Sequence, residues 1–550
     1  MGDRMTVAGE LERRLAARVL NTLLRENYGS IASRVTRDRR GPALVLASGR
    51  RVRLAPGWPF QDFAVREPGG ADPGDGGPPG LGEVLQTLAA VADPADAPGV
   101  AAFERECRDA LAAMRLHHEH RDELAARLTA AGGPGPGRAT IFYETLAATV
   151  DHPLYPTARC RRGLTAAELL AYAPEFAPEF ALTWAAVPRE RVTLGAPGLP
   201  PWWPGWADVG LDPGLARGHV LFPVHPLTLP LAGRIAGVIP ASAPYLTVRP
   251  TLSMRTVEVG PRTHLKLPLP TSTLGLRNRR SIKPGTLRDT ALAESLLREV
   301  LAREPGLRVV PAGEQCHGHA GHEYLGWLVR ELPEGEIVSV AALLAELPGG
   351  RGGERRLVLH DLADRFAGGD PAALLRDYLA VLLEWNVTLF VRYGIALEAH
   401  QQNLALVFGD GPMRLLVKDN DGLLASPALL RAAGLPVPDF TDERMLTDDP
   451  HALADLFVTI TLHLAAMAVA YGALPERAAP MVREALSAAL APFGDDPMAR
   501  LLRARTLEAD RLVAKSMLIA GTLVDKRRTG ARDVNKYYGT TGPNYLRFPS

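Results

Sequence analysis

The spacing of apolar residues changes along the chain, and this change constrains the fold more than any other feature of the sequence. Between Leu221 and Arg277, short runs of Val, Leu and Thr are separated by prolines, which is typical of an antiparallel sheet. Later, Asp370 and Pro371 form an N-cap and N1 pair, and the apolar helical face that follows them ends near Gly394. We therefore expect an α+β fold.

The length of 550 residues, of which 47% are hydrophobic, is too great for one compact core. Residues 66–82 combine Gly, Pro and Asp with hardly any apolar side chain and are predicted to be a flexible surface loop. Because helical patterns lie on both sides, this loop is predicted to be an insertion rather than a domain boundary. A second such segment, residues 132–137, is predicted to be a boundary. We thus predict a mainly helical domain at residues 1–137, a sheet domain at residues 138–345 and a helix-rich domain at residues 346–550.

The charge and cysteine content limit the possible partners and compartments. A formal net charge of +1 gives no field that would attract nucleic acid or an anionic membrane. The three cysteines lack the even number and dense spacing of a disulfide framework, and the N-terminus lacks the apolar segment of a secretory signal. The apolar run from Leu456 to Ala470 is predicted to be a buried core helix. We expect a cytoplasmic protein that binds neither nucleic acid nor membranes.

Polar residues gather at one end of a hairpin that we predict within residues 394–422. Asn403 to Phe408 is typical of a strand, the Gly-Asp-Gly-Pro that follows is typical of a turn, and Met413 to Val417 is typical of the returning strand. Antiparallel pairing brings the residues before the first strand next to those after the second. These residues are Glu398, His400, Gln402, Asn403, Lys418, Asp419 and Asp421.

Oxygen ligands from these Glu, Asp and Asn side chains, with a neighbouring imidazole, suit Mg²⁺ held against nucleotide phosphates. The alternative interpretation is a capped hairpin whose polar end is solvated. The long apolar helix beside the hairpin favours a functional site.

A second polar group follows in the predicted sheet. Alternation along a strand from Thr263 to Leu269 puts His264 and Lys266 on one face and apolar residues on the other. Cations interleaved with hydroxyls suit a polyphosphate, because Arg can clamp oxygens with two hydrogen bonds and Lys acts as a point charge. The alternative is a solvated basic edge strand. The group comprises Ser253, Arg255, Thr256, His264, Lys266, Thr271, Ser272, Thr273, Arg277, Arg279 and Arg280.

A third stretch, from Asp151 to Gly163, has prolines that hold an extended turn, followed by three arginines. It could position an anionic carboxylate, or it could be a structural turn with a solvated basic run. The sequence has neither the Gly-rich loop of P-loop NTPases nor the Gly-x-Ser-x-Gly elbow of α/β-hydrolases.

In their order along the chain, these stretches resemble the motifs of the NRPS-independent siderophore synthetases of the aerobactin synthetase (IucA/IucC) type. The resemblance extends from about Thr140 to the C-terminus. Asp151 to Gly163 resembles Gly-His-Pro-x-His-Pro-x-x-Lys-x-Arg-x-Gly, Ser253 to Thr256 resembles Ser-x-Arg-Thr, and Glu398 to Asn403 resembles Glu-Ala-His-x-Gln-Asn. The chain departs from these patterns at Asp151, at Tyr155 in place of the second His, and at the basic residues Arg159 and Lys418.

The resemblance implies a cupped-hand fold of thumb, fingers and palm, in which the predicted domains would be these three parts in chain order. It implies a homodimer that binds ATP and Mg²⁺ between fingers and palm. Such enzymes convert a carboxylate, commonly citrate or a derivative, into an acyl-adenylate with loss of pyrophosphate. An amine or hydroxyl then attacks the carbonyl carbon.

The resemblance also implies roles for individual residues. The catalytic residues would be Arg255, Lys266, Arg277 and His400. The nucleotide would be bound by Ser253, Thr256, His264, Gln402, Asn403 and Lys418. The acid would be bound by His152, Arg159, Thr273 and Arg277. The metal would be bound by Glu398, Asp419 and Asp421.

Two other functions remain open at this point. A kinase-like small-molecule phosphotransferase could use His400, Asn403 and Asp419 as a catalytic loop and a metal ligand, although no Gly-rich loop with a following Val-Ala-x-Lys is present. A non-catalytic ferric-siderophore-binding protein could use the arginines alone. ADP as a product would indicate the phosphotransferase.

Overall fold

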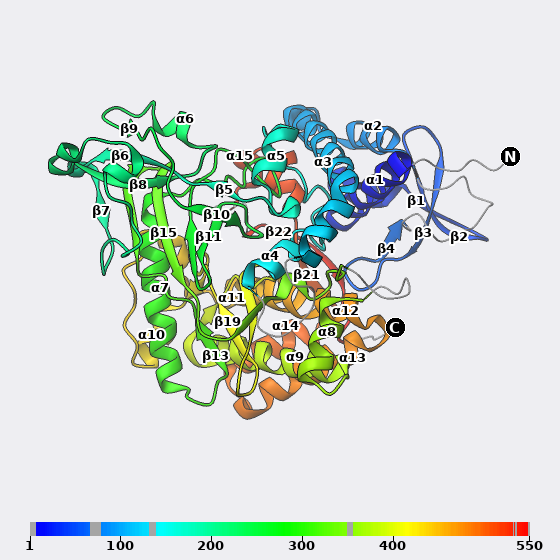
Figure 1. Ribbon diagram of the computed structural model, residues 1–550. Helices are drawn as coiled ribbons and strands as arrows, with labels where there is room; N and C mark the ends of the chain where they lie inside the picture. Colours follow the sequence, from blue (N-terminus) through cyan, green and yellow to red (C-terminus); the bar gives the residue numbers. More distant parts are fainter. Residues whose placement is uncertain are drawn as a thin grey trace.

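The computed structural model describes residues 7–65, 79–130, 139–348, 356–531, 533 and 536–547 (Figure 1). It has helices and mainly antiparallel sheets, which confirms the predicted α+β class. The predicted boundary at residues 132–137 and most of the predicted loop lie outside the described residues. The loop prediction is wrong at its end, because a helix begins at Leu81.

The N-terminal part packs three helices against a four-stranded antiparallel sheet of order β1-β2-β3-β4. The sequence analysis misses this sheet, because its strands are short and partly exposed. Leu518 and Leu523, from the other end of the chain, complete the apolar core. The elements are α1 (Val7–Glu26), β1 (Val35–Asp38), β2 (Gly41–Val45), β3 (Arg51–Pro56), β4 (Phe63–Val65), α2 (Leu81–Val91) and α3 (Ala97–Ala130).

The largest sheet has seven strands in the order β5-β10-β11-β12-β15-β14-β7. Strand β12 lies in its middle, paired with β11 and β15, so the alternative of a solvated edge strand is wrong. His264 is fully buried there and Lys266 is only 3% exposed. The strands are β5 (Phe180–Ala181), β7 (Thr193–Leu194), β10 (Thr247–Pro250), β11 (Thr256–Gly260), β12 (Thr263–Lys266), β14 (His317–His322) and β15 (Leu325–Glu331).

A three-stranded sheet of order β8-β6-β9 shares an apolar core with the seven-stranded sheet. Trp184 and Trp327 are fully buried in this core. Helix α7 contacts β14 and β15, and Figure 1 shows it running along the green sheet. The elements are α4 (Thr140–Ala147), α5 (Ala166–Tyr172), β6 (Thr183–Pro188), β8 (His219–Val224), α6 (Leu229–Ala232), β9 (Ile239–Pro240) and α7 (Pro284–Arg303).

The C-terminal part is built on a four-stranded sheet of order β13-β19-β18-β16. Strands β18 and β19 form the predicted hairpin, with Leu404 opposite Val417. The strands are β13 (Val309–Pro311), β16 (Glu336–Ser339), β18 (Leu404–Phe408) and β19 (Arg414–Val417), with two further pairs, β17 (Ile395–Ala396) with β20 (Leu424–Ala425) and β21 (Arg511–Lys515) with β22 (Tyr538–Pro543).

Helices surround this sheet and form the largest apolar core of the protein. As predicted, Asp370 caps α9 by accepting a hydrogen bond from the Ala372 backbone N–H at 2.8 Å. The helices are α8 (Val358–Phe366), α9 (Pro371–Thr388), α10 (Pro427–Ala432), α11 (Pro450–Leu456), α12 (Ala468–Ala473), α13 (Pro475–Leu490), α14 (Pro497–Thr506) and α15 (Lys526–Thr529), with π-helical segments at Leu389–Tyr393, Phe457–Met467 and Ile519–Leu523.

The helix from Pro450 to Ala473 is long and apolar enough to cross a membrane, and most of it is buried inside the protein. Every residue from Phe457 to Met467 is buried. This confirms the prediction of a buried core helix.

The contact between α3 and the Ile519–Leu523 segment provides a test of how the two ends of the chain pack. A Cβ atom on Gly99 would lie 1.9 Å from the Leu523 carbonyl oxygen. We expect Gly99→Ala to destabilise the protein by about 1–3 kcal/mol, because backbone must move to make room. Gly82→Ala, at an open position in the first turn of α2, is the matched control and should be neutral or stabilising by up to about 1 kcal/mol. Equal melting temperatures of the two variants would contradict this packing.

Candidate active site

A cavity of about 620 Å³ lies where β12, the end of the β18–β19 hairpin, residues 151–159 and the segment after β21 meet. Most of the site residues predicted from the sequence line it. They are His152, Arg159, Ser253, Arg255, Lys266, Thr273, Arg277, Glu398, His400, Gln402, Asn403, Asp419 and Asp421.

The hairpin brings its two polar ends together, as predicted. The Lys418 backbone N–H donates to the Asn403 carbonyl at 3.1 Å, and the Asn403 side chain donates to the Glu398 carbonyl at 3.1 Å. A Cβ atom at position 422 would lie 2.6 Å from the Glu398 carboxyl carbon, so Gly422 leaves room for this side chain. Burial raises the pKa of Glu398, whose carboxyl group faces the cavity.

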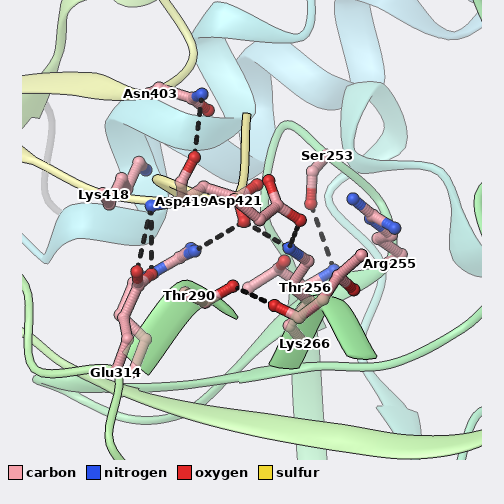
Figure 2. A network of polar contacts seen from close by, with 12 residues as sticks. Ser253, Arg255, Thr256, Lys266, Thr290, Glu314, Asn403, Lys418, Asp419 and Asp421 are labelled. Carbon is pink, nitrogen blue, oxygen red and sulfur yellow. Dashed lines mark hydrogen bonds and ion pairs between the residues drawn. The ribbon is translucent and has the colours of Figure 1, made fainter. Parts of the chain in front are cut away.

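A network of buried charges fixes the position of Asp419 (Figure 2). The Lys266 ammonium pairs with Asp419 and lies 3.6 Å from Asp421. The Asp419 backbone N–H donates to both Glu314 oxygens, at 3.1 and 3.2 Å, and Arg330 Nε donates to Glu314 at 2.5 Å. Asp419, a candidate metal ligand, is therefore held at its side chain by the Lys266 cation and at its backbone N–H by the Glu314 anion.

Electrostatics in this network keep Asp419 ionised. Burial acts to raise the pKa of Asp419, but Lys266, Arg330 and Arg255 outweigh it and hold this pKa far below the usual value. Burial raises the pKa of Glu314, and Arg330 opposes this rise. Among the described residues, no group of three or more His, Cys, Asp or Glu side chains converges closely enough to hold a metal ion unaided. A bound metal would thus need additional oxygens from a ligand.

Basic side chains surround the same region with unused donors. Arg255 donates to the Ser281 carbonyl at 3.1 Å, and Arg277 donates to the Ala520 carbonyl at 3.0 Å. Burial, aided by Arg255, lowers the pKa of Arg280 to about 9. Each guanidinium has further N–H groups that can reach an anion in the cavity.

Three residues at this cavity have strained backbone conformations. Met254, Leu274 and Asp419 have φ angles of 62°, 54° and 62°, which are unfavourable for residues with a side chain. Met254 lies between Ser253 and Arg255, and Leu274 lines the cavity. Such strain is common where a fold positions functional groups, at a cost of about 1–3 kcal/mol each.

The predicted turn at residues 151–159 presents a neutral imidazole. The backbone N–H groups of Leu154 and Tyr155 donate to His152 Nδ1 at 3.1 and 2.9 Å, so Nε2 carries the proton and is a donor. Burial and the nearby His400 lower the pKa of His152 to about 3. Burial and Lys515 likewise lower the pKa of His400 to about 4.

Helix α1 holds two walls of the cavity. Arg18 donates to the His152 carbonyl at 2.7 Å, which fixes the turn. The Glu26 carboxylate accepts hydrogen bonds from the backbone N–H groups of Leu518 at 3.0 Å and Ile519 at 2.9 Å. The N-terminal part therefore positions residues from both later parts.

Two residues of the turn at 151–159 form hydrogen bonds with other residues of the protein. Arg159 Nε donates to Asp151 at 2.9 Å, and its Nη2 donates to the Thr149 carbonyl. Tyr155, which stands where the family has its second His, is fully buried outside the cavity and donates to Glu106 on α3 at 2.8 Å.

Three predicted residues do not line the cavity. Lys418 forms a buried ion pair with Glu144 on α4 at 2.9 Å. Thr256 is buried in β11. His264 is buried in β12, and neither of its ring nitrogens has a hydrogen-bond partner among the described residues. Burial holds its pKa well below the usual value, so it is not part of a cationic face.

Sequence reasoning missed several residues of the site. Arg330 is a lone cation inside the apolar strand Leu325–Glu331, and this signal could have identified it. Glu314 and Glu144 give no local signal, because their partners are distant in sequence. Lys515, which also lines the cavity, ends the short strand β21.

Two family models match segments of the chain that line the cavity. Residues 139–345 match the model of the IucA / IucC family. The chain thus resembles the IucA/IucC family over this segment. Residues 372–530 match the model of the ferric iron reductase FhuF-like transporters. The IucA/IucC match contains β12 and the turn at 151–159, and the second match contains the hairpin.

Two curated relatives carry siderophore names. The rhizobactin siderophore biosynthesis protein RhbC of Rhizobium meliloti is 28% identical over 324 residues, which cover 49% of this chain and 52% of the relative. The staphyloferrin B synthase of Staphylococcus aureus is 26% identical over 375 residues, which cover 58% and 61%. The chain thus matches about half to three fifths of the length of these relatives.

A solved structure shares the fold over nearly the whole chain. The ATP-bound aerobactin synthetase IucA from a hypervirulent pathotype of Klebsiella pneumoniae has a TM-score of 0.70 and 18% identity, covering 97% of this chain and 99% of that one. The predicted fold class and the predicted resemblance to the IucA/IucC family are confirmed. The three domain boundaries and the individual site roles stay predictions.

Breaking the buried network should cost stability. We expect Arg330→Met to destabilise the protein by about 3–5 kcal/mol, because it leaves Glu314 as an uncompensated buried charge. Arg262→Met, which removes an exposed ion pair with Glu334, is the control and should cost less than about 1 kcal/mol. Urea unfolding measures both. Similar midpoints would mean that the buried pair does not stabilise the fold.

The neutral imidazoles predict a pH dependence of stability. A histidine whose pKa is lowered in the folded state takes up a proton on unfolding, so its stabilising contribution is present above pH 6.5 and is lost as the pH falls towards 4. We expect the drop in melting temperature between pH 7 and pH 4 to be smaller by about 2 °C in His400→Gln than in the unmodified protein. The exposed His451→Gln should keep the full drop. An unchanged drop in His400→Gln would show that His400 takes up no proton on unfolding.

Proposed function

We propose that this protein is an ATP-dependent siderophore synthetase that adenylates a carboxylate and joins the acyl group to an amine or hydroxyl. The observation that carries the proposal is the single cavity in which basic residues, an acidic hairpin end and a turn with a neutral imidazole donor meet. The family, the siderophore names of the relatives and the ATP-bound structure of the same fold support it. The proposed compartment is the cytoplasm and the proposed assembly is a homodimer.

Charge repulsion is the main barrier in the first step, because a carboxylate anion must attack the α-phosphate. Arg255, Lys266 and Arg277 would offset the charge on the phosphate oxygens as it develops. The bond that forms joins a carboxylate oxygen to phosphorus, and the bond that breaks releases pyrophosphate. Ser253, Gln402 and Asn403 would orient the nucleotide, and His152 would donate its Nε2 proton to an oxygen of the acid.

The acidic residues fit a Mg²⁺ site that the nucleotide completes. Glu398, Asp419 and Asp421 line the cavity, and Mg²⁺ is commonly bound by one or two carboxylates together with substrate phosphates. When bound, Mg²⁺ would neutralise charge on the leaving pyrophosphate. Lys266 already holds two of these carboxylates in position.

The second step requires little beyond a close approach of the amine or hydroxyl to the acyl-adenylate. AMP leaves when an amine or hydroxyl attacks the activated carbonyl carbon, and the nucleophile loses one proton. A cavity that holds both groups and limits access of water provides the effective concentration that this reaction needs. The acceptor is therefore proposed as a small molecule.

The match to the ferric iron reductase FhuF-like transporters does not extend to a cysteine-bound iron–sulfur cluster. Residues 372–530 contain none of the three cysteines of the chain, so no cysteine-bound iron–sulfur cluster can form within that segment.

The test is pyrophosphate release with ATP and Mg²⁺ over citrate, succinate and 2-oxoglutarate, with hydroxylamine to trap an adenylate. We expect release with one acid, and AMP rather than ADP as the nucleotide product. Arg255→Ala should lower the rate about 10²- to 10³-fold, because it removes a donor to the developing charge. Arg262→Ala, which changes an exposed arginine in the turn between β11 and β12, should leave the rate unchanged.

Other products would decide between the alternatives. ADP without pyrophosphate would indicate a phosphotransferase. Binding of an acid without nucleotide turnover would indicate a binding protein.

A further inference from the structure

Glu106 is a buried carboxylate that the proposed mechanism does not use. It lies on α3, is 6% exposed and is not among the described residues that line the cavity. Its oxygens accept hydrogen bonds from the hydroxyl groups of Tyr155 at 2.8 Å, Thr157 at 2.5 Å and Thr522 at 3.1 Å. The first two donors belong to the turn at 151–159, and the third belongs to the π-helical segment after β21. One carboxylate therefore joins α3 to two segments that are far apart in the sequence.

The first branch of this network leads to His152. The Tyr155 hydroxyl donates to Glu106, and the Tyr155 backbone N–H donates to His152 Nδ1 at 2.9 Å. Tyr155 thus contacts the carboxylate with its side chain and the imidazole with its backbone. A shift of Tyr155 would move the His152 ring, which lines the cavity.

The second branch leads to Arg277. The Thr522 hydroxyl donates to Glu106 and accepts a hydrogen bond from the Leu276 backbone N–H at 3.0 Å. Arg277, the next residue, donates its own backbone N–H to the Gly521 carbonyl at 3.0 Å. The loop that carries Arg277 therefore follows the position of the segment that Glu106 holds.

The chemistry of a carboxylate suits this position. A carboxylate accepts hydrogen bonds at both oxygens, whereas the single oxygen of a Gln side chain has two lone pairs and can accept from at most two of the three hydroxyl groups. Burial raises the pKa of Glu106, and the three hydroxyl donors oppose this rise because they stabilise the charged form. An amide at this position would leave a buried hydroxyl without its acceptor, so at least one donor would be released.

We infer that Glu106 is a positioning residue that sets the distance between His152 and Arg277. It acts on them through the hydrogen bonds of Tyr155 and Thr522. The inference rests on the proposed function, which gives a task to both of the positioned side chains. A displacement of about 1 Å in a reacting geometry can lower a rate about 10²-fold, so release of either branch should impair the reaction as well as the fold.

The first measurement separates the kinetic constants of pyrophosphate release by the full chain. We expect Glu106→Gln to raise the KM for the acid and to lower kcat, each about tenfold, and to change the KM for ATP by less than about twofold. Partial unfolding would lower the apparent kcat without raising either KM. The selective rise in the KM for the acid therefore distinguishes positioning from a loss of folded protein.

The matched control is Glu336→Gln. Glu336 is also a buried carboxylate that accepts a hydrogen bond from a tyrosine, Tyr143, at 2.5 Å. It pairs with Phe408, at the end of β18 opposite to the end that lines the cavity. We expect Glu336→Gln to lower the melting temperature and to keep kcat and both KM values.

The second measurement does not depend on turnover. Hydrogen exchange followed by mass spectrometry reports the backbone N–H groups of each branch. We expect Thr522→Val to speed exchange in residues 273–280 by about tenfold or more and to leave residues 151–159 protected. Tyr155→Phe should do the reverse, because it releases only the turn. Each substitution removes a single hydroxyl group, so these variants test the inference even where Glu106→Gln folds poorly.

Three results would overturn the inference. They are an unchanged KM for the acid in a folded Glu106→Gln, an equal rise in that KM in Glu336→Gln, and unchanged exchange of residues 273–280 in Thr522→Val. If the unmodified protein released no pyrophosphate with any acid, the proposed function would fail, and the exchange measurements alone would decide the inference. Normal release by the unmodified protein, with exchange unchanged in the variants, would refute the inference and leave the proposed function intact.

Discussion

The ion-pair network of Lys266, Glu314, Arg330 and Asp419 is the interaction on which the rest of the site depends. Its members come from β12, the segment before β14, β15 and the end of β19, and Glu314 is fully buried. Taking such charges out of water is costly unless each has a partner, so the four elements must stay in register. The carboxylates and the ammonium are thus in place before any ligand binds, which reduces the reorganisation that a reaction would require.

Part of the site could be predicted from local patterns in the sequence, such as turns and helix caps. The hairpin end was predictable because a turn between two strands fixes which residues meet, and Asn403 and Lys418 do meet. The cap of α9 was predictable for the same reason. Asp370 acts within two residues of its own position.

Distant partners explain what the sequence could not predict. His264 alternates with apolar residues like a half-exposed strand residue, but β12 is paired on both sides, and nothing near it in sequence indicates β15. Lys418 follows the hairpin as expected, yet its partner Glu144 precedes it by 274 residues. Lys515 lines the cavity together with residues of the turn at 151–159, which lies far from it in the sequence. Periodicity describes neighbours along the chain, and these contacts are not between such neighbours.

The hydrogen bonds from α1 to two walls of the cavity also determine when the cavity can form during synthesis. A ribosome releases α1 early, but Leu518 and Ile519, which donate to Glu26, emerge 492 and 493 residues after Glu26. Until then α1 can fix the turn at His152 but not the opposite wall. A nascent chain therefore has no closed cavity, and the ability to bind ligand appears together with the final long-range contacts rather than before them.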